Sequence, residues 1–164
     1  MQTRGVFFVH SSPSVLRPHI EWATAGVLGM PVRLDWYPQP VEPGTFRTEL
    51  SWYGPVGVSE QLASSLSRWQ RLRFEVTEEA TAASEAHRIS YTPRLGLFRA
   101  LTSPSGDMLV PEGRLKAAML ATEGEGRSLR DCIEELLGVP WDDELEPFRH
   151  AGESSPARWL HQVV

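Results

Sequence analysis

The sequence predicts an α+β protein with a ferredoxin-like β-α-β-β-α-β core and a C-terminal α/β extension. Between residues 5 and 79, apolar residues recur first with the two-residue period of a strand and then with the 3.6-residue period of a helix, in that order of elements. A polar, alanine-rich stretch over 78–85 follows. We therefore divide the 164-residue chain into a core, 1–80, and an extension, 81–164, which form one compact unit.

The core is expected to contain four strands, over residues 6–10, 32–37, 46–53 and 72–77. The first helix should begin near Arg17, because Pro18 is tolerated in a first turn and would break a helix interior. Gly29 should end that helix. The second helix places Val58 and Leu62 on one apolar stripe.

The extension is expected to hold a hairpin, two helices and a docked tail. Strands are predicted over 89–91, 95–101 and 108–110. Pro111 opens the first helix, and Ser128 caps the second, which should stop at Gly138 and Pro140. The tail over 141–164 has no clear period but keeps several large aromatic residues, which is typical of a docked segment.

Composition and charge favour a cytoplasmic protein. The net charge is −5, and nine acids against two arginines lie between Glu123 and Glu146. Since no basic stripe could contact phosphates, we expect no nucleic-acid partner. No apolar run approaches the roughly 20 residues of a membrane span, and the N-terminus leads directly into a strand. Cys132 is the single cysteine, which excludes an internal disulfide framework.

The face of the sheet opposite the two helices is predicted to be charged. Its residues alternate in sign, as suits cross-strand pairs on a wetted surface: Arg33, Asp35, Arg47, Glu49, Arg71, Arg73 and Glu75. The face is either solvated or a charged binding platform. A third possibility is that the extension folds over it, because the first strand is apolar on both sides.

A candidate ligand site lies at the end of the first strand. We expect the first and third strands to be parallel neighbours that end at the same edge of the sheet, where the first helix begins. That edge would gather His10, Ser11, Ser12, Ser14, His19, Trp52 and Tyr53. A helix N-terminus attracts anions, and His10 could act as an acid or base. The alternative is structural: the serines cap the helix and His10 packs at a strand end.

Other chemical motifs are weak or absent. The sequence contains no Gly-x-Ser-x-Gly elbow, no phosphate-binding loop and no standard metal-ligand spacing, so we expect no catalytic set, cofactor or metal. One segment combines an aromatic residue with acids: Trp141, Asp142, Asp143 and Glu144. It either docks a basic partner surface or starts a short helix. With Arg47, Arg71 and Arg73, these residues are the candidates for partner binding.

Several motifs resemble a small actinobacterial family of unknown function, of the DUF 3145 type. They include His10-Ser11-Ser12-Pro13-Ser14, Leu34-Asp35-Trp36, Leu72-Arg73-Phe74-Glu75-Val76-Thr77-Glu78-Glu79 and Trp141-Asp142-Asp143-Glu144-Leu145-Glu146-Pro147-Phe148-Arg149. The likeness spans nearly the whole chain, but the family offers no catalytic residues to carry over. The resemblance also implies a link with fatty-acid synthesis, because genes of this type are associated with neighbourhoods that encode the dissociated synthesis enzymes.

The leading hypothesis is a cytoplasmic, non-catalytic binding or regulatory module with a protein partner. If that partner is an acyl-carrier component, which is usually acidic, contact would use the arginines of this chain. The first alternative is a small enzyme that acts on an acyl or anionic small molecule at the His10 edge. The second is a structural subunit of a larger assembly. The oligomeric state stays open.

Overall fold

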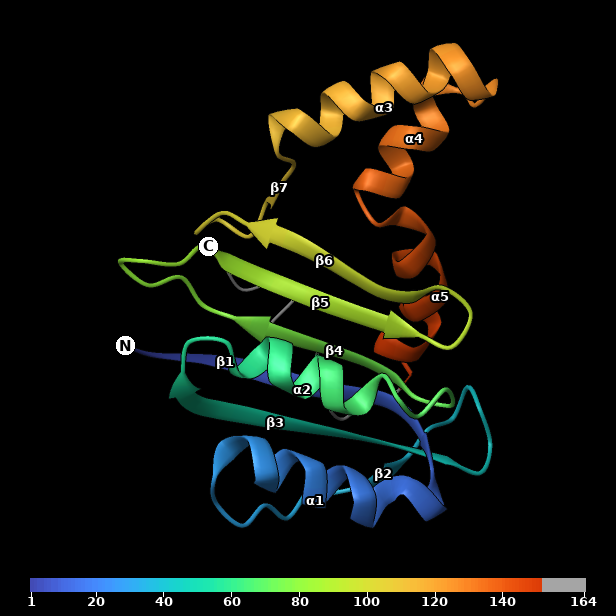
Figure 1. Cartoon of the computed structure of the whole chain (residues 1–164). Coiled ribbons are helices and arrows are strands. Elements are labelled where there is room, and N and C mark those ends of the chain that lie inside the picture. Colours follow the sequence, from blue (N-terminus) through green and yellow to red (C-terminus); the bar gives the residue numbers. More distant parts are fainter. Residues whose placement is uncertain (152–164) are drawn as a thin grey trace.

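The computed structural model describes residues 1–151, and for residues 123–125 it describes the backbone alone. A seven-stranded antiparallel sheet of order β2-β3-β1-β4-β5-β6-β7 forms its centre (Figure 1). The predicted α+β class is confirmed. The strands are β1 (Gln2–Pro13), β2 (Tyr37–Pro38), β3 (Thr45–Pro55), β4 (Arg73–Glu78), β5 (Ala86–Thr92), β6 (Gly96–Thr102) and β7 (Met108–Leu109). The helices are a 3-10 turn η1 (Ser14–Leu16), α1 (Arg17–Leu28), α2 (Val58–Leu66), α3 (Glu112–Glu125), α4 (Leu129–Leu136) and α5 (Val139–Arg149).

Helices α1 and α2 cover one face of the sheet, as expected, and the main core lies beneath them. Phe7, Phe74 and Val76 are fully buried there with Leu62 of α2. Helix α1 begins at Arg17 with Pro18 in its first turn, and Gly29 ends it in the left-handed region at φ 69°. The sheet itself is continuous across the predicted division of the chain, because β4 pairs with β5.

The strand predicted over 32–37 is wrong except at its end, where β2 covers Tyr37–Pro38. The preceding residues form a loop that packs against the core. Leu34 is buried, and Glu21 of α1 accepts hydrogen bonds from the backbone N–H of Leu34 and from the indole of Trp36, both at 3.1 Å. Alternate burial therefore comes from an extended loop anchored by one carboxylate, without a strand partner. Arg33 and Asp35 lie outside the sheet.

The expected parallel pairing of the first and third strands is also wrong. Strands β1 and β3 are antiparallel, with Gly5 opposite Trp52 and Val9 opposite Thr48. Gly5 has no room for a side chain, since a Cβ there would lie 1.8 Å from the carbonyl oxygen of Thr77. Because the strands run in opposite directions, the end of β1 lies beside the start of β3.

The second face of the sheet is partly covered by α5, which contacts β5 and β1. The helix starts after Gly138, whose φ is 73°, and Pro140 sits in its first turn. Pro140 therefore opens a helix, where the prediction made it a stop, because a first-turn residue needs no hydrogen-bonding N–H. A Cβ on Gly138 would approach the ring of Phe98 to 2.3 Å. The predicted docked tail is helical up to Arg149, and its remainder after residue 151 lies outside the described residues.

Helices α3 and α4 form a hairpin that extends beyond the β7 edge of the sheet (Figure 1). Ser128 caps α4 as predicted, since its hydroxyl accepts from the Asp131 N–H at 3.1 Å. Most of α3 is exposed, with Ala118 as a buried residue. The hairpin leaves several large apolar residues exposed: Leu115, Met119, Leu120 and Leu129.

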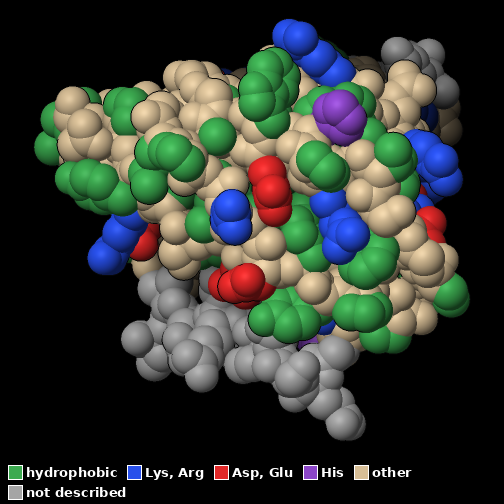
Figure 2. All heavy atoms as spheres, turned by 90° about the horizontal axis from the view of Figure 1, so that it is seen from below, with side chains coloured by type: hydrophobic (Ala, Val, Ile, Leu, Met, Phe, Trp, Pro, Cys, Tyr) green, Lys and Arg blue, Asp and Glu red, His purple; other side chains and the backbone are tan. Residues whose placement is uncertain are grey.

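The opposite side of the molecule, below α1, has a mixed surface. Figure 2 shows hydrophobic side chains there interspersed with charged ones of both signs. Trp22 of α1 is one of the exposed apolar residues of this part of the chain, together with Val15 and Met30. Within residues 1–151, no helix is long and apolar enough to cross a membrane.

Candidate functional site

The structure brings part of the predicted His10 site together and separates the rest. His10, Ser11 and Ser12 are buried at the end of β1, whereas Ser14 and His19 are exposed on η1 and α1. Tyr53 lies opposite Arg4 in the register, at the far end of the sheet, and is also exposed. Trp52 is buried at that far end, opposite Gly5.

The serines do not cap α1, which corrects the capping part of the structural alternative, whereas His10 is packed at the end of β1 as that alternative expected. The residue at the cap position is Leu16, and no side chain caps the helix. The hydroxyl of Ser11 instead donates to Glu42 at 2.6 Å, and Arg73 donates to the same carboxylate at 3.0 Å. These side chains tie β1 and β4 to the loop before β3.

Glu75 is the centre of a buried polar cluster between the sheet and α5, which we call the Glu75 cluster. In β4, Glu75 stands between the core residues Phe74 and Val76, so its side chain points to the second face. Its carboxylate accepts four hydrogen bonds: from Arg149 at 2.6 and 3.0 Å, from His10 at 2.7 Å and from Ser90 at 2.9 Å. Four bonds satisfy the acceptor capacity of a carboxylate.

The ionisation of the Glu75 cluster follows from these bonds. Burial alone would raise the pKa of Glu75, but hydrogen bonds from His10 and Arg149 outweigh it and hold that pKa well below its usual range. Burial would likewise lower the pKa of Arg149, but Glu75 and Asp142 keep it above its usual value. The centre of the cluster is therefore a charged, bidentate arginine–carboxylate pair.

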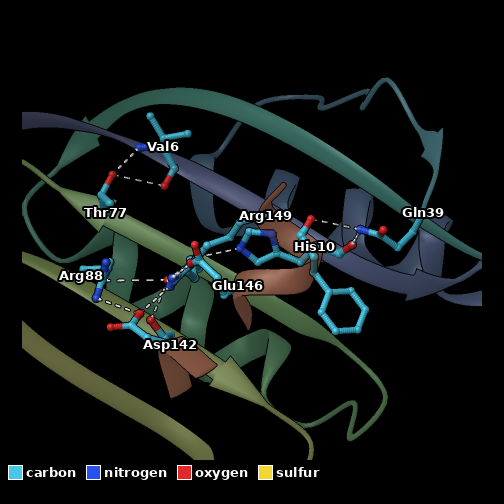
Figure 3. Close-up of polar contacts among 11 residues, drawn as sticks. Val6, His10, Gln39, Thr77, Arg88, Asp142, Glu146 and Arg149 are labelled. Atoms are coloured by element: carbon cyan, nitrogen blue, oxygen red, sulfur yellow. Dashed lines mark hydrogen bonds and ion pairs between the residues drawn. The ribbon is translucent and has the colours of Figure 1, made fainter. Parts of the chain in front are cut away.

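His10 is neutral in this environment. Burial lowers its pKa, and the bond to Glu75 offsets only part of that effect. Because Nε2 faces a carboxylate at 2.7 Å, Nε2 carries the proton, and Nδ1 has no hydrogen-bond partner among residues 1–151. The backbone carbonyl of His10 accepts from Gln39 at 2.8 Å (Figure 3).

The remaining partners of the cluster come from α5 and β5. Arg149 also donates to Asp142 at 2.8 Å and to Glu146 at 3.3 Å. Arg88 of β5 is 3.5 Å from Asp142. Figure 3 shows Arg88, Asp142, Arg149 and His10 converging between the sheet and α5. The cluster fastens α5 to the sheet.

The predicted partner-binding residues mostly make contacts within the chain. Arg47 is buried and donates to the Ala151 carbonyl oxygen, and Arg73 lies 4.6 Å from the ring centre of Phe148. Arg71 is exposed before β4. In α5, the Trp141 indole donates to the Gly96 carbonyl at 2.9 Å and Asp142 joins the Glu75 cluster. Glu144 accepts from Thr92 at 2.8 Å, whereas Asp143 is exposed.

A second buried cluster, of Ser59, Glu78 and His87, was missed by the sequence analysis. The Ser59 hydroxyl donates to Glu78 at 2.8 Å and lies 2.7 Å from Nε2 of His87. Glu78 also accepts from the backbone N–H groups of Gly57 and Ser59, at 2.9 and 3.1 Å. The carboxylate thus caps the N-terminus of α2 and holds the serine hydroxyl in the cap. Nothing in the sequence joins a glutamate at a strand end to a helix start 19 residues earlier.

A groove of about 500 Å³ lies between β6, α3 and α4, and Trp141 of α5 closes one end. Its floor carries small apolar side chains, those of Ala117, Ala118 and Ala121 of α3. The rings of Phe98 and Trp141 stack there with centroids 4.8 Å apart. We call this feature the α3–α4 groove. It falls within the size range of ligand sites.

Arginines from β6, α3 and the loop between α3 and α4 line the α3–α4 groove. They are Arg99 of β6, Arg114 of α3 and Arg127, which precedes α4. Among the described residues of this lining, three arginines stand against one acid, Glu135, within a chain of net charge −5. The sequence analysis missed these arginines because they are distant in sequence, and Arg127 lies inside the most acidic stretch.

A larger cavity, of about 900 Å³, lies at the other end of the sheet and has a mixed lining. Arg4 and Arg88 are opposed there by Glu78, Glu79 and Asp107. Arg4 is already paired with Glu79 at 2.8 Å. Among residues 1–151, no group of three His, Cys, Asp or Glu side chains could hold a metal ion. The α3–α4 groove is therefore the better candidate for a binding site. Its arginines and apolar floor favour an occupant that is both acidic and partly apolar.

These features define an α+β protein with an antiparallel sheet, buried charge clusters and, in its described part, an arginine-lined groove. The chain belongs to the family described as "Protein of unknown function (DUF3145)", whose model matches residues 6–162. The family resemblance seen in the sequence motifs is thereby confirmed. No curated protein and no solved structure matches the chain.

Proposed function

We propose that this chain is a non-catalytic binding or regulatory module that holds an acidic, amphipathic segment of a partner protein in the α3–α4 groove. The observation that supports the proposal is the combination of an apolar floor with arginines from β6, α3 and the loop between α3 and α4. Charge complementarity of this kind selects partners and accelerates their association.

Arg99 and Arg114 are the arginines of the groove on which a partner can act. Arg99 pairs with Glu60 at 2.8 Å, but both side chains of that pair are about half exposed. Exposed pairs contribute little to stability, so a partner carboxylate can replace Glu60. For Arg114, no carboxylate in the described side chains lies within ion-pair distance.

The floor and its surroundings favour a helical segment over a small polar molecule. Alanine side chains allow the backbone of a second helix to approach α3 closely. The Phe98–Trp141 stack supplies a rigid aromatic contact at one end. Leu97 of β6, which lines the groove, remains exposed, and an apolar stripe on a partner helix could cover it.

The internal clusters support binding over catalysis. His10 is buried and its Nε2 is committed to Glu75, so the His10 edge offers no accessible base. The Ser59 hydroxyl is buried within the cap of α2. Because the His10 ring and the Ser59 hydroxyl are themselves buried, the small-enzyme alternative gains no support from these two groups.

Two finer proposals accompany this function. The order β2-β3-β1-β4, with α1 and α2 on one face, supports a ferredoxin-like core to which β5, β6 and β7 have been added at one edge. The composition and the single cysteine support a cytoplasmic location, and the family resemblance supports a role beside fatty-acid synthesis. The arginines of the groove would give an acidic carrier component a contact surface.

Binding of synthetic peptides tests the proposed function. The probe is a helix-forming peptide of about 15 residues with a leucine stripe flanked by glutamates, and a second peptide carries lysines in place of the glutamates. We expect fluorescence anisotropy to show binding of the glutamate peptide alone. We also expect that binding to weaken as salt shortens the Debye length from about 10 Å at 0.1 M to about 3 Å at 1 M.

Matched charge reversals locate the peptide. Arg99→Glu with Arg114→Glu should weaken binding of the glutamate peptide at least about tenfold. Arg71→Glu is the control, because Arg71 is exposed and lies outside the groove. Equal binding of the two peptides, binding of neither, or loss of binding on Arg71→Glu alone would overturn the proposal.

A further inference from the structure

Helix α5 belongs to both the α3–α4 groove and the Glu75 cluster. We propose that protonation of His10 in mild acid releases α5 from the sheet and thereby removes one wall of the groove. The inference rests on the proposed function for its purpose, but its mechanism can be tested without any ligand.

The first turn of α5 forms the end of the groove. Trp141 lines the groove, stacks on Phe98 and donates its indole N–H to Gly96 at 2.9 Å. Gly138 allows this approach, because a side chain at that position would collide with the Phe98 ring. The groove is closed at this end only while α5 lies against β6.

Asp142, which follows Trp141, and Arg149, in the last turn of α5, hold the helix to the sheet through charge. Asp142 accepts from Arg149 at 2.8 Å and lies 3.5 Å from Arg88 of β5. Arg149 in turn makes the bidentate pair with Glu75. Trp141 and Asp142 are adjacent, so a change that weakens the Glu75 cluster acts directly on the wall of the groove.

His10 is the member of the Glu75 cluster that can change charge under mild conditions. The groups around it are Phe8 and Gln39, with Glu75 of β4, Arg149 and Glu146 of α5, Arg47 of β3, and Arg88 and Ser90 of β5. A proton on Nδ1 would find no acceptor among the described residues. It would also place a second cation beside Arg149 on one carboxylate.

Departure of α5 relieves this arrangement. When the helix leaves, water can reach the imidazolium, and Glu75 can pair with it without competition from Arg149. The low pKa of His10 agrees with this geometry, because burial and the nearby arginines disfavour its charged form. His150, at the end of α5, lies outside the Glu75 cluster: it is exposed, and its Nε2 is 2.7 Å from Glu146.

Hydrogen exchange of the full chain, read by mass spectrometry, tests the mechanism. Rates are compared at about pH 7.5 and about pH 5.5, one unit below the ordinary histidine pKa, after correction for intrinsic exchange. We expect peptides from α5 to lose up to about tenfold in protection at the lower pH, while those from β1 and β4 change little. Unchanged protection of α5, or equal loss throughout the sheet, would overturn the proposal.

Variants assign the effect to one side chain. His10→Gln keeps an N–H donor toward Glu75 and cannot be charged, so it should abolish the pH dependence of α5. His150→Gln is the matched control and should leave that dependence in place. If His10→Gln does not fold, the Trp141 indole resonance of the wild-type protein serves instead. It should shift with the same midpoint as the His10 ring, and different midpoints would overturn the proposal.

The two proposals fail in different ways. Release of α5 at low pH together with no peptide binding at any pH would contradict the proposed function and leave the α5 mechanism standing. Peptide binding that is equally tight at both pH values, with α5 protected throughout, would contradict the mechanism and leave the proposed function standing.

Discussion

Arg149 and Glu75 are 74 residues apart in the chain, yet the guanidinium of Arg149 donates two hydrogen bonds, of 2.6 and 3.0 Å, to the Glu75 carboxylate. Both side chains are buried, at 5% and 0% exposure. One belongs to β4 and the other to the last turn of α5. This pair fixes α5 on the second face of the sheet and so determines where Trp141 meets the α3–α4 groove.

Loss of the Glu75 carboxylate should destabilise the fold strongly. Glu75→Gln leaves the buried guanidinium of Arg149 without its counter-ion, and removing one partner of a buried pair costs about 3–5 kcal/mol in the free energy of unfolding. Urea titration followed by tryptophan fluorescence measures the change. Glu79→Gln is the control and should have little effect, because its pair with Arg4 is exposed. Similar losses for the two variants would contradict this role of Glu75.

Acid should destabilise the protein in two stages. The pKa of His10 is lowered by burial, so below about pH 6.5 the unfolded chain binds a proton that the folded chain does not, and stability falls as pH falls. The pKa of Glu75 is also lowered, so the stability it contributes is lost as pH falls below about 4.3. Free energies of unfolding measured across this range should show both stages. His10→Gln should remove the first stage alone, and a rise in stability on acidification from neutral pH would be inconsistent with a buried neutral His10.

Gly138 should tolerate no side chain. An alanine there takes a left-handed conformation and its Cβ meets the Phe98 ring at 2.3 Å, so Gly138→Ala should cost about 2–4 kcal/mol. Gly26→Ala is the control. It lies within α1 with open space around it and should gain up to about 1 kcal/mol. Chemical denaturation of the two variants decides the point, and a neutral Gly138→Ala would mean that α5 can dock in another way.

The cap on α2 should be a source of stability. Glu78→Gln replaces a charged acceptor of three hydrogen bonds by a neutral amide, at a cost of about 1–3 kcal/mol. Thermal unfolding followed by circular dichroism should show a Tm lower by about 3–8 °C. The neighbouring variant Glu79→Gln should keep the wild-type Tm. An unchanged Tm for Glu78→Gln would show that the cap contributes little to the stability of the fold.

Local sequence patterns predicted the elements of this fold well, and pairing between elements poorly. The start of α1 at Pro18 and its end at Gly29 depend on backbone preferences of single residues, which a sequence displays directly. Burial of Leu34 and Trp36 produced a strand-like alternation in a loop, because one carboxylate of α1 anchors both residues. The period of apolar residues alone cannot distinguish a strand from a loop whose alternate residues are anchored to the core.

The polar clusters were beyond prediction because their members meet through tertiary structure. Glu75 was assigned to a charged face, and the partner that buries it, Arg149, lies in a segment without clear periodicity. Phe8 gave a signal, since an apolar residue on the second face of a strand indicates that something covers that face. The sequence did not predict that a helix, α5, covers this face. Pro140 was interpreted as the end of a helix, and it lies near the start of one.

We propose that the α3–α4 groove is the binding surface of this protein. Affinity capture from a lysate of the source organism, with size-exclusion chromatography and mass spectrometry, tests it when three forms are compared in parallel. The wild-type chain and Arg71→Glu should retain the same partner at fixed stoichiometry, and Arg99→Glu with Arg114→Glu should lose it. Retention of that partner by the groove variant, or its loss on Arg71→Glu, would contradict the claim.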